Sequence, residues 1–126
     1  MQVKLIDFGS AIFYGRGITK QPLLYHPETY GGTRIYMQPE IHEGEPYRTA
    51  PGDVWALGVV LYQMLTGERP FWDVEMVKRG TMAYDPSNLQ NMDDLLMLWP
   101  VISGCLEMDP ERRLSPMQLY THPSLN

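Results

Sequence analysis

Residues 51–66, PGDVWALGVVLYQMLT, carry the strongest helix signal in the chain and decide its fold. The segment opens with Pro-Gly-Asp and is followed by Gly67, a good residue for a helix end. Its apolar side chains surround the predicted helix instead of forming one stripe: Val54, Trp55, Leu57, Val59, Val60, Leu61, Met64 and Leu65. A helix that is apolar all round is typical of the middle of a bundle. The sequence therefore predicts a buried central helix.

Shorter helices are expected on the C-terminal side of this segment, over residues 73–79, 99–108 and 116–122. The first has acidic residues at its start and basic ones at its end, and Ser115-Pro116 introduces the last. On the N-terminal side, residues 3–6 are a short apolar run that suits a buried strand. About thirty residues without a sustained period then lead to Pro39, a length that is usually functional in an ordered loop. We expect a mainly α fold with one short N-terminal strand and one long loop.

Composition excludes several classes of protein. The chain has 126 residues, 44% of them hydrophobic, which suits one domain or a part of one and excludes disorder throughout. The net charge of -5 disfavours nucleic acid as a partner, because phosphates repel an acidic surface. The longest uncharged run, residues 54–67, is too short to cross a bilayer, and the first residues contain no signal-peptide core. With a single cysteine, Cys105, that cannot form an intrachain disulfide, we expect an intracellular protein, cytoplasmic or nuclear, without a membrane partner.

Four motifs follow one another along the chain. Asp7-Phe8-Gly9 follows the apolar run, residues 32–40 (GTRIYMQPE) fit the pattern G-T-x-x-Y-x-x-P-E, residues 53–58 (DVWALG) open the central helix, and residues 109–113 are DPERR. In this order they resemble the C-terminal lobe of a eukaryotic protein kinase, from the Asp-Phe-Gly motif onward. The resemblance covers essentially the whole chain. LIDFGSA and GTRIY look most similar to the Pim and calmodulin-dependent branch, and Thr33 resembles the serine/threonine type.

The resemblance implies a partial kinase domain over residues 1–126, with an activation segment at about 7–40 and a helical subdomain at about 41–126. In the complete kinase, Asp7 would bind the Mg²⁺ that bridges the phosphates of ATP. Phe8 would pack under a helix of the other lobe, and Gly9 would let the loop change course. Residue chemistry alone, without the resemblance, indicates that Asp7 is a turn or cap residue.

The resemblance also implies structural and substrate-facing residues. Glu40 and Arg113 match a pair that closes across the lobe, and Asp53 matches a residue that hydrogen-bonds the backbone of the catalytic loop. Trp55 and Gly58 belong to the motif of the central helix. The loop that faces a protein substrate would contain Gly32, Thr33, Tyr36 and Pro39.

Thr29 matches the usual activation-loop phosphosite, which implies an upstream activating kinase as a further partner. An unmodified hydroxyl is the alternative. Two other residues depart from the family pattern. Gln38 replaces the usual Ala, which a partly exposed loop would tolerate, and Gln63 stands where kinases that prefer basic substrates often carry a carboxylate.

The Gly-rich loop, the strand Lys and the His-Arg-Asp catalytic loop of the family have no counterpart in these 126 residues. We expect that the complete protein phosphorylates Ser or Thr of proteins, and that this chain alone binds neither Mg²⁺ nor ATP and transfers no phosphate. The alternative is a catalytically inactive kinase-like piece or a pseudokinase-type protein-binding module. The strand at residues 3–6 would also lack its hairpin mate, and apolar surface would face water, so we expect marginal stability or aggregation.

Overall fold

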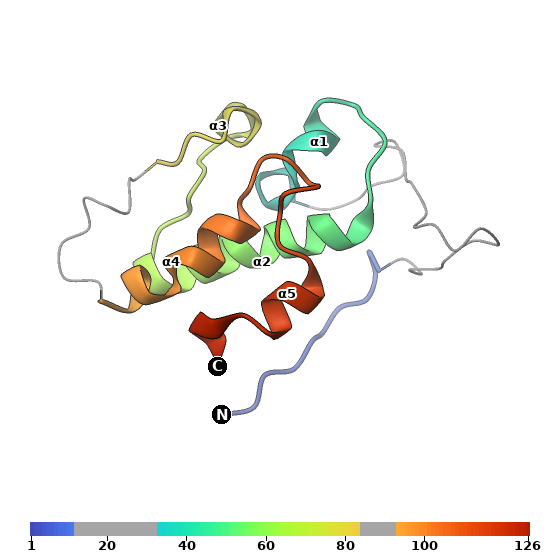
Figure 1. Ribbon diagram of the computed structural model, residues 1–126. Helices are drawn as coiled ribbons and strands as arrows, with labels where there is room; N and C mark the ends of the chain where they lie inside the picture. The colour runs from blue at the N-terminus through green and yellow to red at the C-terminus, as the bar shows by residue number, and fades with distance from the viewer. Residues whose placement is uncertain (12–32, 84–92) are drawn as a thin grey trace.

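The computed structural model describes residues 1–11, 33–83 and 93–126, and within these ranges it contains helices and no β-strand. Figure 1 shows α4 running along α2, with α1 and α3 on one side of α2 and α5 on the other. The elements in chain order are η2 (Arg34–Tyr36), α1 (Pro39–His42), α2 (Thr49–Thr66), α3 (Val74–Arg79), α4 (Asp93–Cys105), α5 (Pro116–Tyr120) and η4 (Pro123–Leu125).

Helix α2 confirms the predicted central helix, although it begins two residues earlier, at Thr49. Pro51 lies in its first turn, where the missing N–H of proline costs no intrahelical hydrogen bond. Gly67 ends the helix in the left-handed conformation, at φ 75°, and its N–H donates to the carbonyl of Gln63 at 2.8 Å. Trp55 and Tyr62 are fully buried and form the centre of the main hydrophobic core.

Gly58 sets the distance between α2 and α4. A Cβ at this position would lie 2.6 Å from the Cβ of Cys105 and 3.0 Å from Cδ2 of Leu106. Because the Cβ of Cys105 is fixed to the backbone of α4, a side chain at Gly58 would force the helices apart. The glycine of the DVWALG motif therefore serves helix packing.

Helix α4 is longer at its start than the predicted helix at residues 99–108, because it begins at Asp93 and ends at Cys105. Pro100 therefore lies inside the helix and not near its start. The hydroxyl of Ser103 donates to the carbonyl of Trp99 at 2.8 Å. Cys105 is buried in the core as predicted, and burial raises the pKa of its thiol to about 11, which makes it an unreactive thiol at neutral pH.

The predicted burial of α2 on all sides is wrong for one face. Leu57, Val60 and Met64 are 43%, 41% and 73% exposed, and Asp53 continues the same row of exposed residues toward the N-terminus of the helix. These four residues are spaced at i, i+4, i+7 and i+11, which places them along one face, called here the open face of α2. Within the described ranges no segment covers this face, so the apolar residues meet water.

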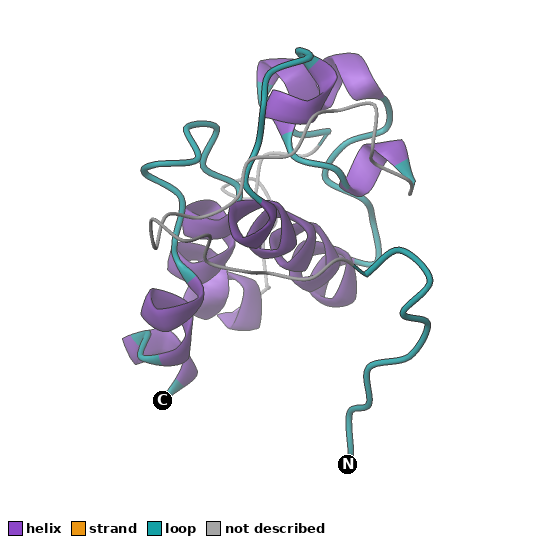
Figure 2. Cartoon of the chain, turned by 90° about the vertical axis from the view of Figure 1, so that its right-hand side faces the viewer, coloured by secondary structure: helices purple, strands orange, loops and turns teal. Residues whose placement is uncertain are grey.

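The predicted strand at residues 3–6 does not form. Val3, Leu5 and Ile6 are 83–84% exposed, and Figure 2 shows this N-terminal segment leading away from the helices. A strand needs a neighbour for its backbone N–H and C=O groups, and none of the residues in the described ranges pairs with it. The apolar pattern fits a strand, but the described residues contain no second strand to pair with it.

The short helices carry the predicted end signals. The carboxylate of Asp73 accepts from the N–H of Met76 at the start of α3, and Gly80 ends that helix at φ 63°. Ser115 and Gln118 form a reciprocal capping box at the start of α5. None of the helices in the described part of the chain is long and apolar enough to span a membrane.

Candidate functional site

The predicted substrate-facing loop is described from Thr33 onward, and together with α1 it forms one unit over residues 33–42, called here the ledge. The N–H of Tyr36 donates to the carbonyl of exposed Thr33 at 3.1 Å, which closes the turn of η2. Pro39 is the first residue of α1 and is buried. Met37 and Ile41 pack with Tyr47 in a small hydrophobic cluster under the ledge. The ledge is therefore anchored from below while Thr33 faces solvent.

Tyr36 fastens the ledge to the second half of α2. Its hydroxyl donates to Oε1 of Gln63 at 3.0 Å. The side-chain amide that stands in place of a carboxylate thus accepts a hydrogen bond from the ledge itself. A neutral amide also gives this end of the ledge no negative charge with which to attract a basic peptide.

Gln38 lies in the interior. The expectation that Gln38 replaces Ala in a partly exposed loop is therefore wrong. Its residue is 1% exposed, and its Nε2 donates to the carbonyl of Arg48 at 3.4 Å. The amide lies against Gly52, where a Cβ would come within 2.2 Å of Oε1. The side chain is tolerated because the helix presents bare backbone to it.

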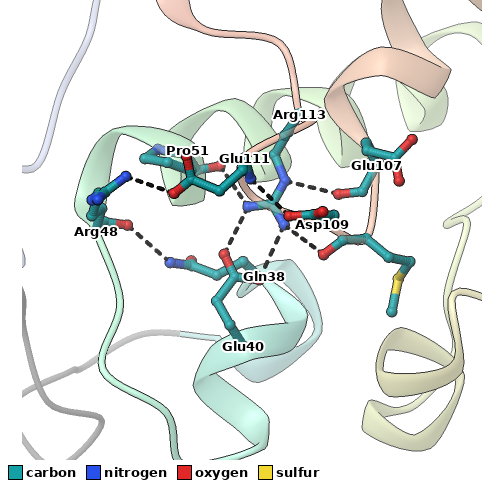
Figure 3. A network of polar contacts seen from close by, with 9 residues as sticks. Gln38, Glu40, Arg48, Pro51, Glu107, Asp109, Glu111 and Arg113 are labelled. Atoms are coloured by element: carbon teal, nitrogen blue, oxygen red, sulfur yellow. Dashed lines mark hydrogen bonds and ion pairs between the residues drawn. The ribbon is translucent and has the colours of Figure 1, made fainter.

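The Glu40–Arg113 pair confirms the predicted contact across the lobe. Nη1 of Arg113 lies 2.8 Å from Oε1 of Glu40 and Nη2 lies 3.0 Å from Oε2, a two-pronged ion pair that Figure 3 shows from close by. The side chain of Arg113 is fully buried and that of Glu40 is 14% exposed. A buried bidentate pair of this kind holds both residues in one orientation.

All five N–H groups of the Arg113 guanidinium find an acceptor. Besides the two carboxylate oxygens of Glu40, they reach the carbonyls of Pro51 at 3.0 Å, Glu107 at 2.9 Å and Met108 at 3.3 Å. We call this set of contacts the clasp. It joins the ledge to the start of α2 and to the segment after α4. Because no donor is left unpaired, the cost of burying the charge is largely offset.

Trp55 lies between Arg113 and Phe71. The guanidinium carbon is 5.1 Å from the indole centroid, and the ring of Phe71 stacks at 5.5 Å with the planes 10° apart. The indole Nε1 is buried and has no hydrogen-bond partner in the described part of the chain. The tryptophan of the DVWALG motif is therefore a packing platform for the clasp.

A tight turn in the DPERR motif presents Arg113 to its partners. The carboxylate of Asp109 accepts from the N–H of Glu111 at 3.0 Å, and its carbonyl accepts from the N–H groups of Arg112 and Arg113. At the surface above this turn, Arg48 and Glu111 form an exposed ion pair of 2.7 Å. The first residue of the motif thus shapes the backbone that carries the buried arginine.

His42 closes the ledge on itself, a contact that the sequence did not predict. Its Nε2 lies 2.9 Å from the carbonyl of Arg34, so this nitrogen carries the proton. Burial, together with the positive charges of Arg34 and Lys78, lowers the pKa of His42 below its usual range, although the hydrogen bond acts in the opposite direction. The neutral imidazole therefore joins α1 to η2.

Asp53 lies on the open face of α2 and makes no hydrogen bond within the described ranges. The residue is exposed, yet surrounding atoms shield its carboxylate from water enough to raise its pKa above the usual range. Its predicted partner, a catalytic-loop backbone, has no counterpart in the sequence. The predicted role of Asp53 therefore stays a prediction.

Asp7 adopts the turn that residue chemistry alone favours. At φ 60° it is in the left-handed region, and its Oδ1 accepts from the N–H of Gly9 at 3.2 Å. Phe8, predicted to pack under another lobe, is 71% exposed. The carboxylate is a suitable hard ligand for Mg²⁺, but the described residues hold no group of three or more His, Cys, Asp or Glu side chains that could share a metal ion.

Two candidate residues, Thr29 and Gly32, lie outside the described residues. Of the remaining candidates, the structure brings together Glu40, Trp55 and Arg113 in the clasp and places Thr33, Tyr36 and Pro39 on the ledge beside it. Asp7, Phe8, Gly9 and Asp53 are not part of this assembly. The burial of Gln38 was missed, and its only sequence signal is a large polar residue in a motif position where a small one is usual.

Comparison with known proteins agrees with this geometry. The model of the protein kinase domain family matches residues 1–125. The mitosis inducer protein kinase cdr1 of Schizosaccharomyces pombe is 36% identical over 98% of this chain, and the serine/threonine-protein kinase ppk25 of the same organism is 37% identical over 98%. The PAS domain-containing serine/threonine-protein kinase of Mus musculus is 36% identical over 96%. The chain spans 20%, 28% and 8% of the lengths of these three relatives.

The packed helices of the described residues fit the helical lobe of a kinase-type domain. The chain belongs to the protein kinase domain family, and two of the relatives named above are serine/threonine protein kinases. Complete members of the family use ATP and Mg²⁺ and act on proteins.

Proposed function

We propose that this chain is the peptide-docking portion of a serine/threonine protein kinase. In the complete protein, the γ-phosphoryl group of ATP would pass to a Ser or Thr hydroxyl of a protein substrate. The observation that carries the proposal is the clasp, in which a fully satisfied buried arginine holds the ledge against α2. Phosphoryl transfer depends on positioning, and a ledge held this firmly is suited to orient a peptide.

The finer assignments rest on residues of the sequence. Within the family we propose a place near the Pim and calmodulin-dependent branch, supported by LIDFGSA at residues 5–11 and GTRIY at residues 32–36. Thr33 supports Ser or Thr as the accepting residue, and neutral Gln63 supports a substrate that is not strongly basic. We propose Thr29 as the residue that an activating kinase phosphorylates. The net charge of -5 supports a protein without nucleic-acid partners, and the shortness of the uncharged segments supports an intracellular protein without a membrane partner.

Asp7 would contribute one carboxylate ligand to the Mg²⁺ of the nucleotide in the complete kinase. Mg²⁺ supplies charge neutralisation for the phosphates when it is bound. Leaving the turn with Gly9 would free both carboxylate oxygens for this role. The 126-residue chain by itself is proposed to bind neither the metal nor ATP, which is supported by the lack of any group of three or more His, Cys, Asp or Glu side chains around Asp7 in the described residues.

One observation favours a second candidate function, a catalytically inactive kinase-like module that binds another protein. The open face of α2 exposes Leu57, Val60 and Met64 in one row, and an apolar row of this kind is suited to contact with another polypeptide. In the kinase reading, the polypeptide that covers this row is the remainder of the lobe. In the alternative reading, it is a separate protein.

Transcript sequence upstream of the Met1 codon separates the two readings. We expect an in-frame Gly-rich loop, a strand Lys and a His-Arg-Asp segment, and the product of that transcript should phosphorylate Ser or Thr in protein substrates with Mg²⁺ and ATP. An Asp7→Ala variant of that product should lose this activity, while Arg48→Met, which alters an exposed ion pair, should keep it. A stop codon directly ahead of Met1 in frame, or a complete product without activity, would support the binding module.

Titration calorimetry tests the chain by itself. Injecting Mg²⁺ and ATP into the 126-residue protein should give no binding heat above that of dilution. A saturable heat that disappears in Asp7→Ala would show that the chain holds a nucleotide site of its own.

A further inference from the structure

Gln38 is unusual among the interior residues because it is polar and uncharged. Within the described ranges, the buried polar or charged residues are Gln38 and Arg113. Arg113 is explained by the clasp, whereas the side chain of Gln38 makes one hydrogen bond in the described part of the chain, to the carbonyl of Arg48, at a distance near the outer limit. A weak hydrogen bond does not offset the free-energy cost of burying an amide, so packing of the side chain has to offset the remainder.

Gly52 supplies that packing. An ideal Cβ at residue 52 would lie 2.2 Å from Oε1, 2.5 Å from Nε2 and 2.6 Å from Cδ of Gln38. All the atoms of the amide group therefore press against the bare backbone of α2, in space that any other side chain at residue 52 would take. Glycine weakens a helix relative to alanine, so its presence here fits a need for that space.

The position of Gln38 in the chain gives this contact a consequence. It is the N-cap of α1, and only Met37 separates it from η2, so it joins the two halves of the ledge. The ledge touches α2 again where Tyr36 donates to Gln63. Residues 52 and 63 are separated by about 16 Å along a helix axis. Contacts at both places prevent the ledge from sliding or turning on α2.

We propose that Gln38 is a positioning residue, a wedge seated in a notch formed by Gly52, and that it sets the register of the ledge on α2. The role rests on the proposed function, in which the ledge receives the substrate peptide. Gln38 does not touch the reacting groups. It acts through the orientation of Thr33, Tyr36 and Pro39.

A double-mutant cycle tests the wedge without any kinase assay. Gln38→Ala, Gly52→Ala and the double variant are made in the 126-residue chain, and their unfolding equilibria are measured in urea. When residue 38 is Ala, Gly52→Ala should raise the stability of the chain, because alanine favours a helix more than glycine does. When residue 38 is Gln, the same substitution should not raise the stability, because the new Cβ displaces the amide of Gln38. We therefore expect the effect of Gly52→Ala on the unfolding constant to differ by about fivefold or more between the two backgrounds.

Gly58→Ala is the matched control. It lies in the same helix, but its Cβ would meet Cys105 and Leu106 and not Gln38. Its effect should be the same with Gln or Ala at residue 38, within about twofold. If Gly52→Ala behaves as Gly58→Ala does, with equal effects in both backgrounds, Gln38 is not seated in a notch and the proposal is wrong.

Hydrogen exchange separates positioning from general stability. Gln38→Ala and Gly52→Ala should each speed exchange at the amides of Tyr36, Met37 and Ile41, while amides of α4 keep their protection under conditions where the chain stays folded. Gly52→Ala added to Gln38→Ala should give no further increase. Equal acceleration in the ledge and in α4 would mean that Gln38 only stabilises the fold, which would overturn the positioning role. Neither readout requires activity, so the wedge can fail while the proposed function stands.

Discussion

Replacing Arg113 with Met removes the whole set of donors from the clasp while keeping a side chain of similar length. The carboxylate of Glu40, only 14% exposed, would lose both of its partners, and the carbonyls of Pro51, Glu107 and Met108 would lose theirs. Removing one member of a buried ion pair costs about 3–5 kcal/mol. The free energy of unfolding of a small domain is only about 5–15 kcal/mol, so much of the stability would disappear.

Urea unfolding followed by tryptophan fluorescence and by far-ultraviolet circular dichroism measures this loss. Trp55 contacts the guanidinium directly, so its emission should change with the clasp. Arg48→Met is the matched control, because it breaks an ion pair of 2.7 Å with Glu111 at the exposed surface. Such a pair is worth about 0–1 kcal/mol. If Arg113→Met costs no more than Arg48→Met, the account of the clasp is refuted.

Substitutions at other contacts should have smaller effects on stability, which can be measured separately. Gly58→Ala should lower the free energy of unfolding by about 1–3 kcal/mol through the clash with Cys105, and an unchanged urea midpoint would contradict the close approach of the helices. Tyr36→Phe and Gln63→Leu should each cost about 0.5–1.5 kcal/mol, and the double variant should cost less than their sum if the hydrogen bond is real. The pKa of His42 is lowered by folding, so the unfolded chain binds a proton first as the pH falls below 6.5. Urea midpoints should therefore fall between pH 7.5 and 5.5, and less so in His42→Gln; an equal fall in that variant would assign the pH dependence to other groups.

The central helix and the clasp could be predicted because their signals are local or lie in fixed motifs. Apolar residues at helical spacing identify α2, and Glu40 and Arg113 each stand in a motif that the family resemblance carries. Capping residues such as Ser115 also act within a few positions of themselves. These features need no knowledge of which distant segments meet.

The open face of α2 and the unpaired segment at residues 3–6 could not be read from the same patterns. The apolar side chain of Val60 favours burial, but Val60 is buried only if another segment lies against it. The strand propensity of Val3 or Leu5 likewise requires a mate. A sequence pattern shows that a segment favours burial or strand pairing. It does not show whether another segment is there to cover it or pair with it, and the described residues contain no such segment.

The wedge and the His42 contact escaped prediction for another reason. Gln38 and Gly52 are each unremarkable as residues, and their fit is visible only when the two are placed against each other. His42 lies eight residues from the carbonyl that it binds, in a turn without a regular spacing. Contacts of this kind depend on the path of the backbone and not on a periodic signal.

The length of chain between the two halves of the clasp has a consequence for synthesis on the ribosome. Arg113 follows Glu40 by 73 residues, so the acidic half emerges from the exit tunnel well before its partner has been added. At about 5–20 residues per second, the ledge waits several seconds without its anchor. During this interval nascent-chain chaperones have access to a ledge whose clasp cannot close until Arg113 has been added.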